Sequence, residues 1–108
     1  MKVCLAIFAM LTSISAFADP YVTVSDACNL SLQMEALNAV KQTDHMTYFY
    51  QGAELESPAS STKPGAVVVV FQAMDQTTSG TTTIKVEVLF NGDLNPNCTA
   101  VKGSAKLQ

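Results

Sequence analysis

The chain has 108 residues with six lysines, no arginine and nine acidic residues, and its formal net charge is −3. Binding to nucleic acids or to anionic membrane surfaces depends on clustered positive charge, and phosphate recognition favours guanidinium groups. The composition therefore argues against nucleic acid and against a charged membrane surface as partners.

The first 18 residues have the pattern of a secretory signal peptide. Lys2 precedes an apolar run at 3–11, and the small residues of the tripeptide AFA, which ends at Ala18, are typical of a signal-peptidase site. The run is too short for a membrane span, which needs about 20 apolar residues. We expect residues 1–18 to be removed, leaving 19–108 as a single small exported domain, periplasmic or secreted, with no membrane anchor.

Two of the three cysteines remain after this cleavage, because Cys4 leaves with the signal peptide. Cys28 and Cys98 form an even pair in an exported protein, and an oxidising compartment favours a disulfide between them. Closing a loop of about 70 residues stabilises a fold by roughly 4 kcal/mol in the chain-entropy model. The alternative is two free buried thiols. A metal site is not expected, because the chain lacks the closely spaced ligand pairs of zinc sites.

The mature chain begins with a short predicted strand at 20–24 and a predicted helix at 27–42. The strand alternates and is β-branched, and Pro20 places it at an edge. Helical spacing of the apolar residues defines the second element. Its polar side chains fall on one narrow stripe, which we expect to face water; the stripe consists of Ser31, Glu35, Asn38 and Gln42.

A strand and a long loop are predicted next. Residues 46–51 are rich in strand formers. Residues 52–65 hold two prolines, two glycines and three serines, which predicts a long loop. Loops of this length in a small domain are usually functional or mobile.

The second half of the mature chain has a strong strand pattern. Residues 66–74 are almost wholly apolar, as in a central strand. Residues 83–90 alternate, and the side chains expected on the buried face are Ile84, Val86, Val88 and Phe90. A short strand starts at Cys98, and the tail 105–108 is expected to fray.

These elements predict an α+β domain in which one N-terminal helix packs on an antiparallel sheet of four or five strands. A Cys28–Cys98 bond would join the start of the helix to the start of the final strand. This arrangement is similar in outline to small exported proteins of the YebF and colicin M immunity type, which also join a leading helix to antiparallel strands by a disulfide. The similarity is one of arrangement, and no functional residue follows from it.

Catalytic groups are scarce. The one histidine, His45, follows Asp44 directly, and adjacent residues at a helix end do not form a triad with a nucleophile. We expect His45 to lie at the helix C-terminus, where the dipole favours positive charge. Glu54 and Glu56 lie in the predicted loop and read as solvated charges. We therefore expect no catalytic residues, no cofactor and no enzyme activity.

The strand residues also predict a surface that could bind another protein. If Phe49 faces inward, the sheet face opposite the helix carries an apolar patch, and the acidic loop would form its rim. The expected partner-binding residues are Tyr48, Tyr50, Met46, Leu89, Glu54 and Glu56. The alternative is that Tyr48 and Tyr50 point inward as ordinary core.

The sequence thus predicts a small exported, non-catalytic protein that binds another protein, as an immunity protein or an inhibitor does. Two other functions stay open. One is a structural protein that assembles with itself through strand edges. The other is a carrier of a small ligand. The sequence leaves the identity of the partner and the oligomeric state undetermined.

Overall fold

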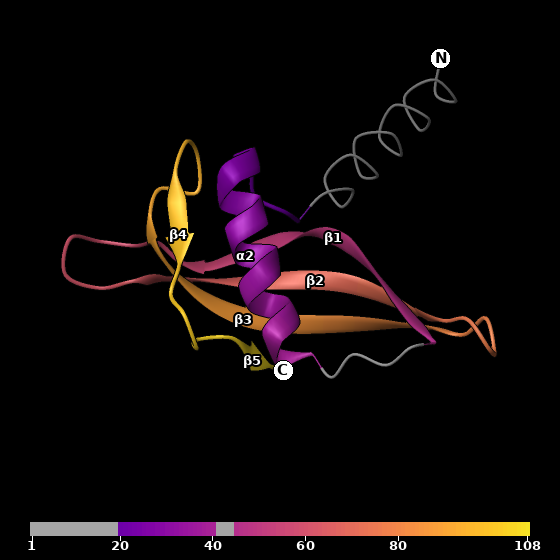
Figure 1. The fold of residues 1–108 in the computed structure, drawn as a ribbon. Coiled ribbons are helices and arrows are strands. Elements are labelled where there is room, and N and C mark those ends of the chain that lie inside the picture. The colour runs from indigo at the N-terminus through magenta and orange to yellow at the C-terminus, as the bar shows by residue number, and fades with distance from the viewer. Residues whose placement is uncertain (1–19, 41–44) are drawn as a thin grey trace, which may run out of the picture.

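A computed structural model describes residues 20–40 and 45–108 of the chain. These described residues form one helix followed by five strands (Figure 1). The elements are α2 (Asp26–Ala39), β1 (Met46–Ser57), β2 (Gly65–Asp75), β3 (Thr81–Gly92), β4 (Cys98–Ala100) and β5 (Lys106–Leu107).

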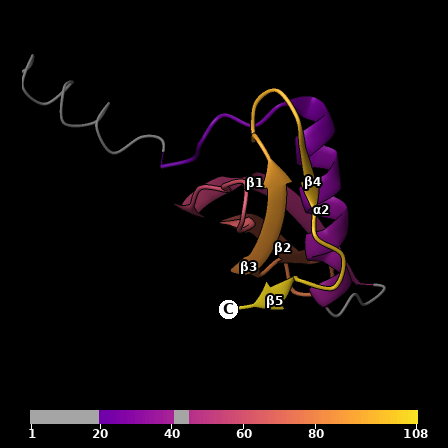
Figure 2. The same cartoon turned by 90° about the vertical axis from the view of Figure 1, so that its left-hand side faces the viewer.

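All five strands form one antiparallel sheet in the order β1-β2-β3-β4, and β5 also pairs with β3. Strands β4 and β5 therefore pair with different parts of the same edge of β3. Its end, from Phe90 to Gly92, pairs with β4, and its middle, at Val86 and Glu87, pairs with β5. The helix lies across one face of the sheet, next to β4 (Figure 2). The predicted fold class is confirmed.

Helix α2 begins at a side-chain cap. Ser25 has extended backbone angles, and its Oγ accepts a hydrogen bond from the backbone N–H of Cys28 at 3.4 Å. Asp26 places a negative charge in the first turn, where the helix dipole favours it. The helix ends at Ala39, and Val40 is extended. The predicted helix at 27–42 is thus confirmed with a shorter C-terminal end.

The disulfide joins Cys28, in the first turn of α2, to Cys98, the first residue of β4. The two Cα atoms are 4.8 Å apart, and both residues are buried. The predicted pairing is confirmed. It fixes the start of the helix to the strand at the edge of the sheet.

The core lies between α2 and one face of β2 and β3. Leu32 and Ala36 of the helix are fully buried in it. The sheet contributes alternate residues of each strand, namely Val67, Val69 and Phe71 from β2 and Val86, Val88 and Phe90 from β3. The alternation predicted for 83–90 is therefore confirmed, with Ile84 partly buried at the margin of the same cluster.

The opposite face of β2 is also shielded from solvent. Val68 and Val70 are buried there. Glu54 lies beside Val68 in the register, and Lys85 lies beside Val70. The 3.8 Å ion pair between Glu54 and Lys85 therefore crosses β2 above these two valines.

Three further predictions from the sequence are wrong. Residues 20–24 form no strand, although the N–H of Val22 donates to the carbonyl of Ala53 at 2.9 Å. The predicted loop at 52–65 is shorter, because β1 continues to Ser57 and leaves only 58–64 as the connection. The expected fraying of the tail is also wrong.

The extended β1 and the ordered tail have identifiable causes. The valine-rich β2 pairs with β1 as far as Ser57, and irregularities between Tyr50 and Gly52 and between Leu55 and Ser57 absorb the residues that break the alternation. The tail is held by β5 and by the N–H of Gln108, which donates to the carbonyl of Lys85 at 2.9 Å.

The predicted signal peptide and its cleavage point lie outside the described residues, as do Lys41 to Asp44 at the end of the predicted helix. Within 20–40 and 45–108, no helix is long and apolar enough to span a membrane.

Candidate functional site

Two residues of the predicted polar stripe of α2 face the protein, whereas Asn38 is exposed as expected and Gln42 lies outside the described residues. Ser31 Oγ accepts a hydrogen bond from the N–H of Ala100 at 2.9 Å. Glu35 is only 6% exposed, and its Oε2 accepts from the N–H of Gly103 at 2.9 Å and of Ala105 at 3.3 Å. The prediction that this stripe faces water is therefore wrong for Ser31 and Glu35. Ser31 thus accepts from the last residue of β4, and Glu35 accepts from the segment between β4 and β5.

This orientation leaves apolar side chains of the helix in solvent. Leu30 and Met34 are each 62% exposed. With the exposed Ala27 and the partly buried Leu37, they follow a 3-4-3 spacing along the helix. We call these four residues the helix stripe. Apart from Asp26 at its start, the exposed side of α2 carries no charge.

An open groove runs beside the helix stripe, between α2 and the chain that follows Cys98. Its volume is about 400 Å³, and it is lined by Ser31, Met34, Glu35, Asn38, Thr99, Ala100 and Lys102. Met34 provides its apolar wall, and Lys102 provides its one positive charge. The helix stripe and this groove form one continuous surface with mostly apolar and uncharged character.

The predicted docking face is not assembled around the tyrosines. Tyr48 lies opposite Ala73 and Tyr50 opposite Phe71, and both of these buried residues alternate with the helix-facing Val67 and Val69 of β2. Directly opposed residues in an antiparallel pair share a face. Tyr48 and Tyr50 therefore pack against the core, and Phe49 points the other way and is 48% exposed. The prediction that the tyrosines lie opposite the helix is wrong.

Tyr50 contacts both the sheet and the helix. Its ring meets Phe71 edge-on, with 6.2 Å between the ring centroids. Burial raises the pKa of the Tyr50 hydroxyl, and a side-chain hydrogen bond with Asn29 of α2 partly offsets that rise. The residue thus ties the edge strand to the start of the helix.

The six predicted partner-binding residues are divided between the two faces. Met46 shares the helix-facing side with the tyrosines, as its position two residues before Tyr48 requires. Leu89 and Glu54 lie on the opposite side, where they flank Ala66 and Val68 in the register. The six residues do not form one patch, and their role in binding stays a prediction.

The opposite side also holds two facing acidic side chains. A side-chain hydrogen bond and the nearby negative charge of Glu56 raise the pKa of Glu87, and the charge of Lys106 works against this rise. Glu54 and Glu56, which the sequence placed in a loop, are therefore residues of β1. Glu54 pairs with Lys85, and Glu56 faces Glu87.

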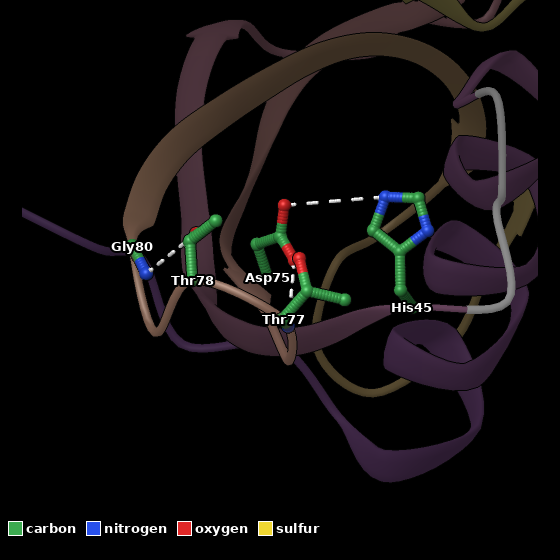
Figure 3. A network of polar contacts seen from close by, with 5 residues as sticks. All are labelled: His45, Asp75, Thr77, Thr78 and Gly80. Atoms are coloured by element: carbon green, nitrogen blue, oxygen red, sulfur yellow. Dashed lines mark hydrogen bonds and ion pairs between the residues drawn. The ribbon is translucent and has the colours of Figure 1, made fainter.

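A polar network of His45, Asp75 and Thr77 lies where β1 begins and β2 ends (Figure 3). His45 Nε2 lies 3.9 Å from Asp75 Oδ2. Asp75 Oδ1 accepts hydrogen bonds from the N–H of Thr77 at 2.8 Å and from its hydroxyl at 2.6 Å, which lower the pKa of Asp75. The prediction that His45 completes the helix C-terminus is wrong, because it precedes β1 beside the β2–β3 turn.

The geometry of this network is that of a stabilised turn and not that of a catalytic site. The Thr77 hydroxyl donates to the carboxylate of Asp75, so the histidine does not activate it as a nucleophile. Thr78 Oγ1 accepts from the N–H of Gly80 at 3.2 Å and continues the same turn. Across the two described segments, no three His, Cys, Asp or Glu side chains gather where they could hold a metal ion.

Sequence reasoning missed Leu30 and Met34 as surface residues, because apolar side chains at helical spacing are usually core. The signal that could have identified them is the pair Ser31 and Glu35, which at i and i+4 can reach backbone donors of one neighbouring segment.

Comparison with known proteins adds no relative. The chain matches no family model, and no curated protein and no solved structure matches it. The described residues form a small α+β domain with the Cys28–Cys98 disulfide.

Proposed function

We propose that this chain is a small exported protein, periplasmic or secreted, that acts without catalysis by binding another protein through the helix stripe. The observation that carries the proposal is the orientation of α2 on the sheet, in which Glu35 is buried and Leu30 and Met34 are exposed. An immunity or inhibitor role is compatible with the small size, the disulfide and the uncharged contact surface.

Burial of the two large side chains, Leu30 and Met34, would favour association with a partner. Complete burial of a leucine or methionine side chain stabilises an assembly by about 1.5–3 kcal/mol. Leu30 and Met34 are each 62% exposed, so their burial by a partner would contribute roughly 2–4 kcal/mol in total. Large apolar side chains that lie together at a surface commonly mark an interaction site.

The helix stripe also defines the chemistry of the partner. A 3-4-3 spacing of apolar residues is the pattern by which one helix packs against another. We propose an amphipathic helix as the occupant, laid along the 14 residues of α2 with its apolar side on the helix stripe. Lys102 in the adjoining groove favours an acidic residue at the flank of that helix.

The test uses the mature protein as bait in an extract of secreted and envelope proteins from the source organism. The bait is compared with the double variant Leu30→Glu/Met34→Glu and with Phe49→Lys as a matched control, since Phe49 is exposed on the opposite face. The supporting result is a protein that the wild type and the control retain and the double variant loses. The purified partner should then bind the double variant at least about tenfold more weakly.

Melting temperatures of all three baits control for folding, and they should agree closely because the altered side chains are exposed. A partner that binds the double variant as tightly as the wild type contradicts the proposal, as does a retained set of proteins that is identical for all baits. Charge reversal in Lys102→Glu should weaken binding more at low ionic strength than at high ionic strength, because the expected contact is electrostatic.

A further inference from the structure

An open pocket of about 240 Å³ lies at the end of the sheet that carries the β1–β2 connection and the turn after β3 (Figure 1). It shares no lining residue with the groove beside α2. One wall comes from the end of β1 and the connection that follows it, and the other comes from the turn after β3. The first wall holds Leu55, Pro58 and Ala59, and the second holds Asp93, Leu94 and Asn95.

The base of this pocket is apolar and its rim is polar. Phe90, which also lines the pocket, is 2% exposed and belongs to the core between helix and sheet. Gly65 leaves room for its ring, because a Cβ at that position would collide with the ring of Phe90. Asp93 and Asn95, by contrast, are exposed. A ligand that places an apolar group over Phe90 would therefore keep its polar end at the rim, in contact with water.

Both walls of the pocket are tied to the rest of the protein. Ala59 and Leu94 pack against the core cluster. The carbonyl of Leu94 accepts a hydrogen bond from the N–H of Ser25, the cap of α2, at 2.9 Å. The N–H of Asp93 donates to the carbonyl of Asn97, also at 2.9 Å. Because the walls are already ordered in the free protein, a ligand would pay little conformational entropy to bind there.

The volume of the pocket limits the size of the ligand. An apolar cavity of about 150 Å³ can hold benzene. Sites for drug-sized molecules begin at about 300 Å³. The pocket, at about 240 Å³, lies between these values, so it suits a single ring or a branched chain with a short polar extension.

The charge of the pocket selects the polar end of the ligand. Asp93 is the only charged side chain among the described residues that line it. The chain as a whole has a net charge of −3, so its field also favours a cation over an anion. We propose that this pocket binds a small amphiphilic cation, namely an aromatic or branched-chain primary amine, with its apolar group over Phe90 and its ammonium group at Asp93. This site goes beyond the proposed function, because the helix stripe takes no part in it.

Titration of the mature protein with 2-phenylethylamine at neutral pH, followed by amide NMR shifts, tests the inference. The amides of Ala59, Asp93 and Leu94 should shift with a dissociation constant on the order of 1 mM, as expected of a one-ring ligand in an open pocket. The matched probe is 3-phenylpropionate, which has the same ring but a carboxylate, and it should bind at least about threefold more weakly. High ionic strength should reduce this difference, since Asp93 is exposed.

Variants separate the charged contact from the apolar one. Asp93→Asn should weaken binding of the amine about two- to fivefold, which is the range of an exposed ion pair, and should remove most of the preference over the carboxylate. Leu55→Ala shortens an apolar wall and should weaken both probes equally. Leu107→Ala is the matched control, because it truncates another exposed leucine on β5, and it should bind both probes as the wild type does. All three variants alter exposed side chains, so their melting temperatures should match that of the wild type.

Three outcomes would overturn the inference. The first is that the pocket amides do not shift at amine concentrations up to about 20 mM, or that the shifts centre on the groove beside α2 instead. The second is equal affinity of the wild type for the two probes. The third is a preference for the amine that Asp93→Asn leaves unchanged. The helix variant Leu30→Glu/Met34→Glu should bind the amine normally, so failure of this site and failure of the helix stripe are distinguishable.

Discussion

Replacing Glu35 by alanine should release the chain that follows β4. Its carboxylate accepts from the N–H groups of Gly103 and Ala105, and the residue is 6% exposed. A hydrogen bond to a charged group contributes about 1.5–3 kcal/mol. Gly103 is exposed, so water can replace part of its bond, and we expect Glu35→Ala to lower the free energy of unfolding by about 2–4 kcal/mol.

Thermal unfolding measures this effect. In a domain of this size about 1 kcal/mol corresponds to roughly 4–8 °C, so the melting temperature of Glu35→Ala should fall by roughly 8–32 °C. Glu35→Gln keeps an acceptor oxygen in place and should lose less than half as much. Ser31→Ala is the matched control, because it removes a single bond, to Ala100, from the same face of the helix.

Amide hydrogen exchange shows which backbone hydrogen bonds each variant loses. Glu35→Ala should increase exchange at Gly103 and Ala105, and Ser31→Ala should increase it at Ala100 instead. A change in melting temperature of less than about 3 °C in Glu35→Ala, or unchanged protection of the Gly103 and Ala105 amides, would show that Glu35 does not hold this segment.

Four other outcomes are expected. Cys98→Ser should cost about 2–5 kcal/mol of stability in denaturant titrations, as loss of a disulfide does in small secreted domains, whereas an unchanged midpoint would mean that the bond contributes nothing. Tyr50→Ala should lower the melting temperature by well over 5 °C because its ring packs on the core, and a surface role would leave it unchanged. Limited proteolysis should cut first within 58–64, and early cleavage inside a strand would show that this connection is packed. Glu87→Gln should raise the melting temperature at neutral pH. The raised pKa means that folding favours the protonated acid, so wild-type stability falls as pH rises above the ordinary value of 4.5, and the gain should vanish below it.

The pattern of hydrophobic residues was sufficient to predict the architecture. The apolar run that became β2 and the clean alternation that became β3 each define a strand without reference to the rest of the chain. The two cysteines that remain after the predicted cleavage supplied the long-range contact between helix and sheet. These features act locally or by elimination, which is why sequence alone is enough.

The orientation of α2 could not be predicted in the same way. Apolar side chains occur around most of the helix, so periodicity does not select the buried side. The orientation depends on Ser31 and Glu35, whose partners are backbone amides 68–70 residues away. Backbone amides leave no mark in a sequence, since every residue except proline carries one.

The faces of β1 were ambiguous for another reason. Tyr48, Phe49 and Tyr50 are all strand formers, and alternation places neighbours on opposite faces without saying which is inside. Only the pairing of Tyr50 with Phe71 settles the matter. The end of the strand was hidden because the irregularity at Gly52 looks like the beginning of a loop.

The long span between the helix and the segment that anchors it sets the order in which the chain can fold. Helix α2 emerges from the ribosome early, but Ala100, Gly103 and Ala105, which hold its polar side chains, are synthesised about 70 residues later. Contacts of such high sequence separation form late and slowly. Until those residues are synthesised, Ser31 and Glu35 lack the backbone donors that they accept from in the folded protein, so the side of α2 that is buried can be fixed only at the end of synthesis.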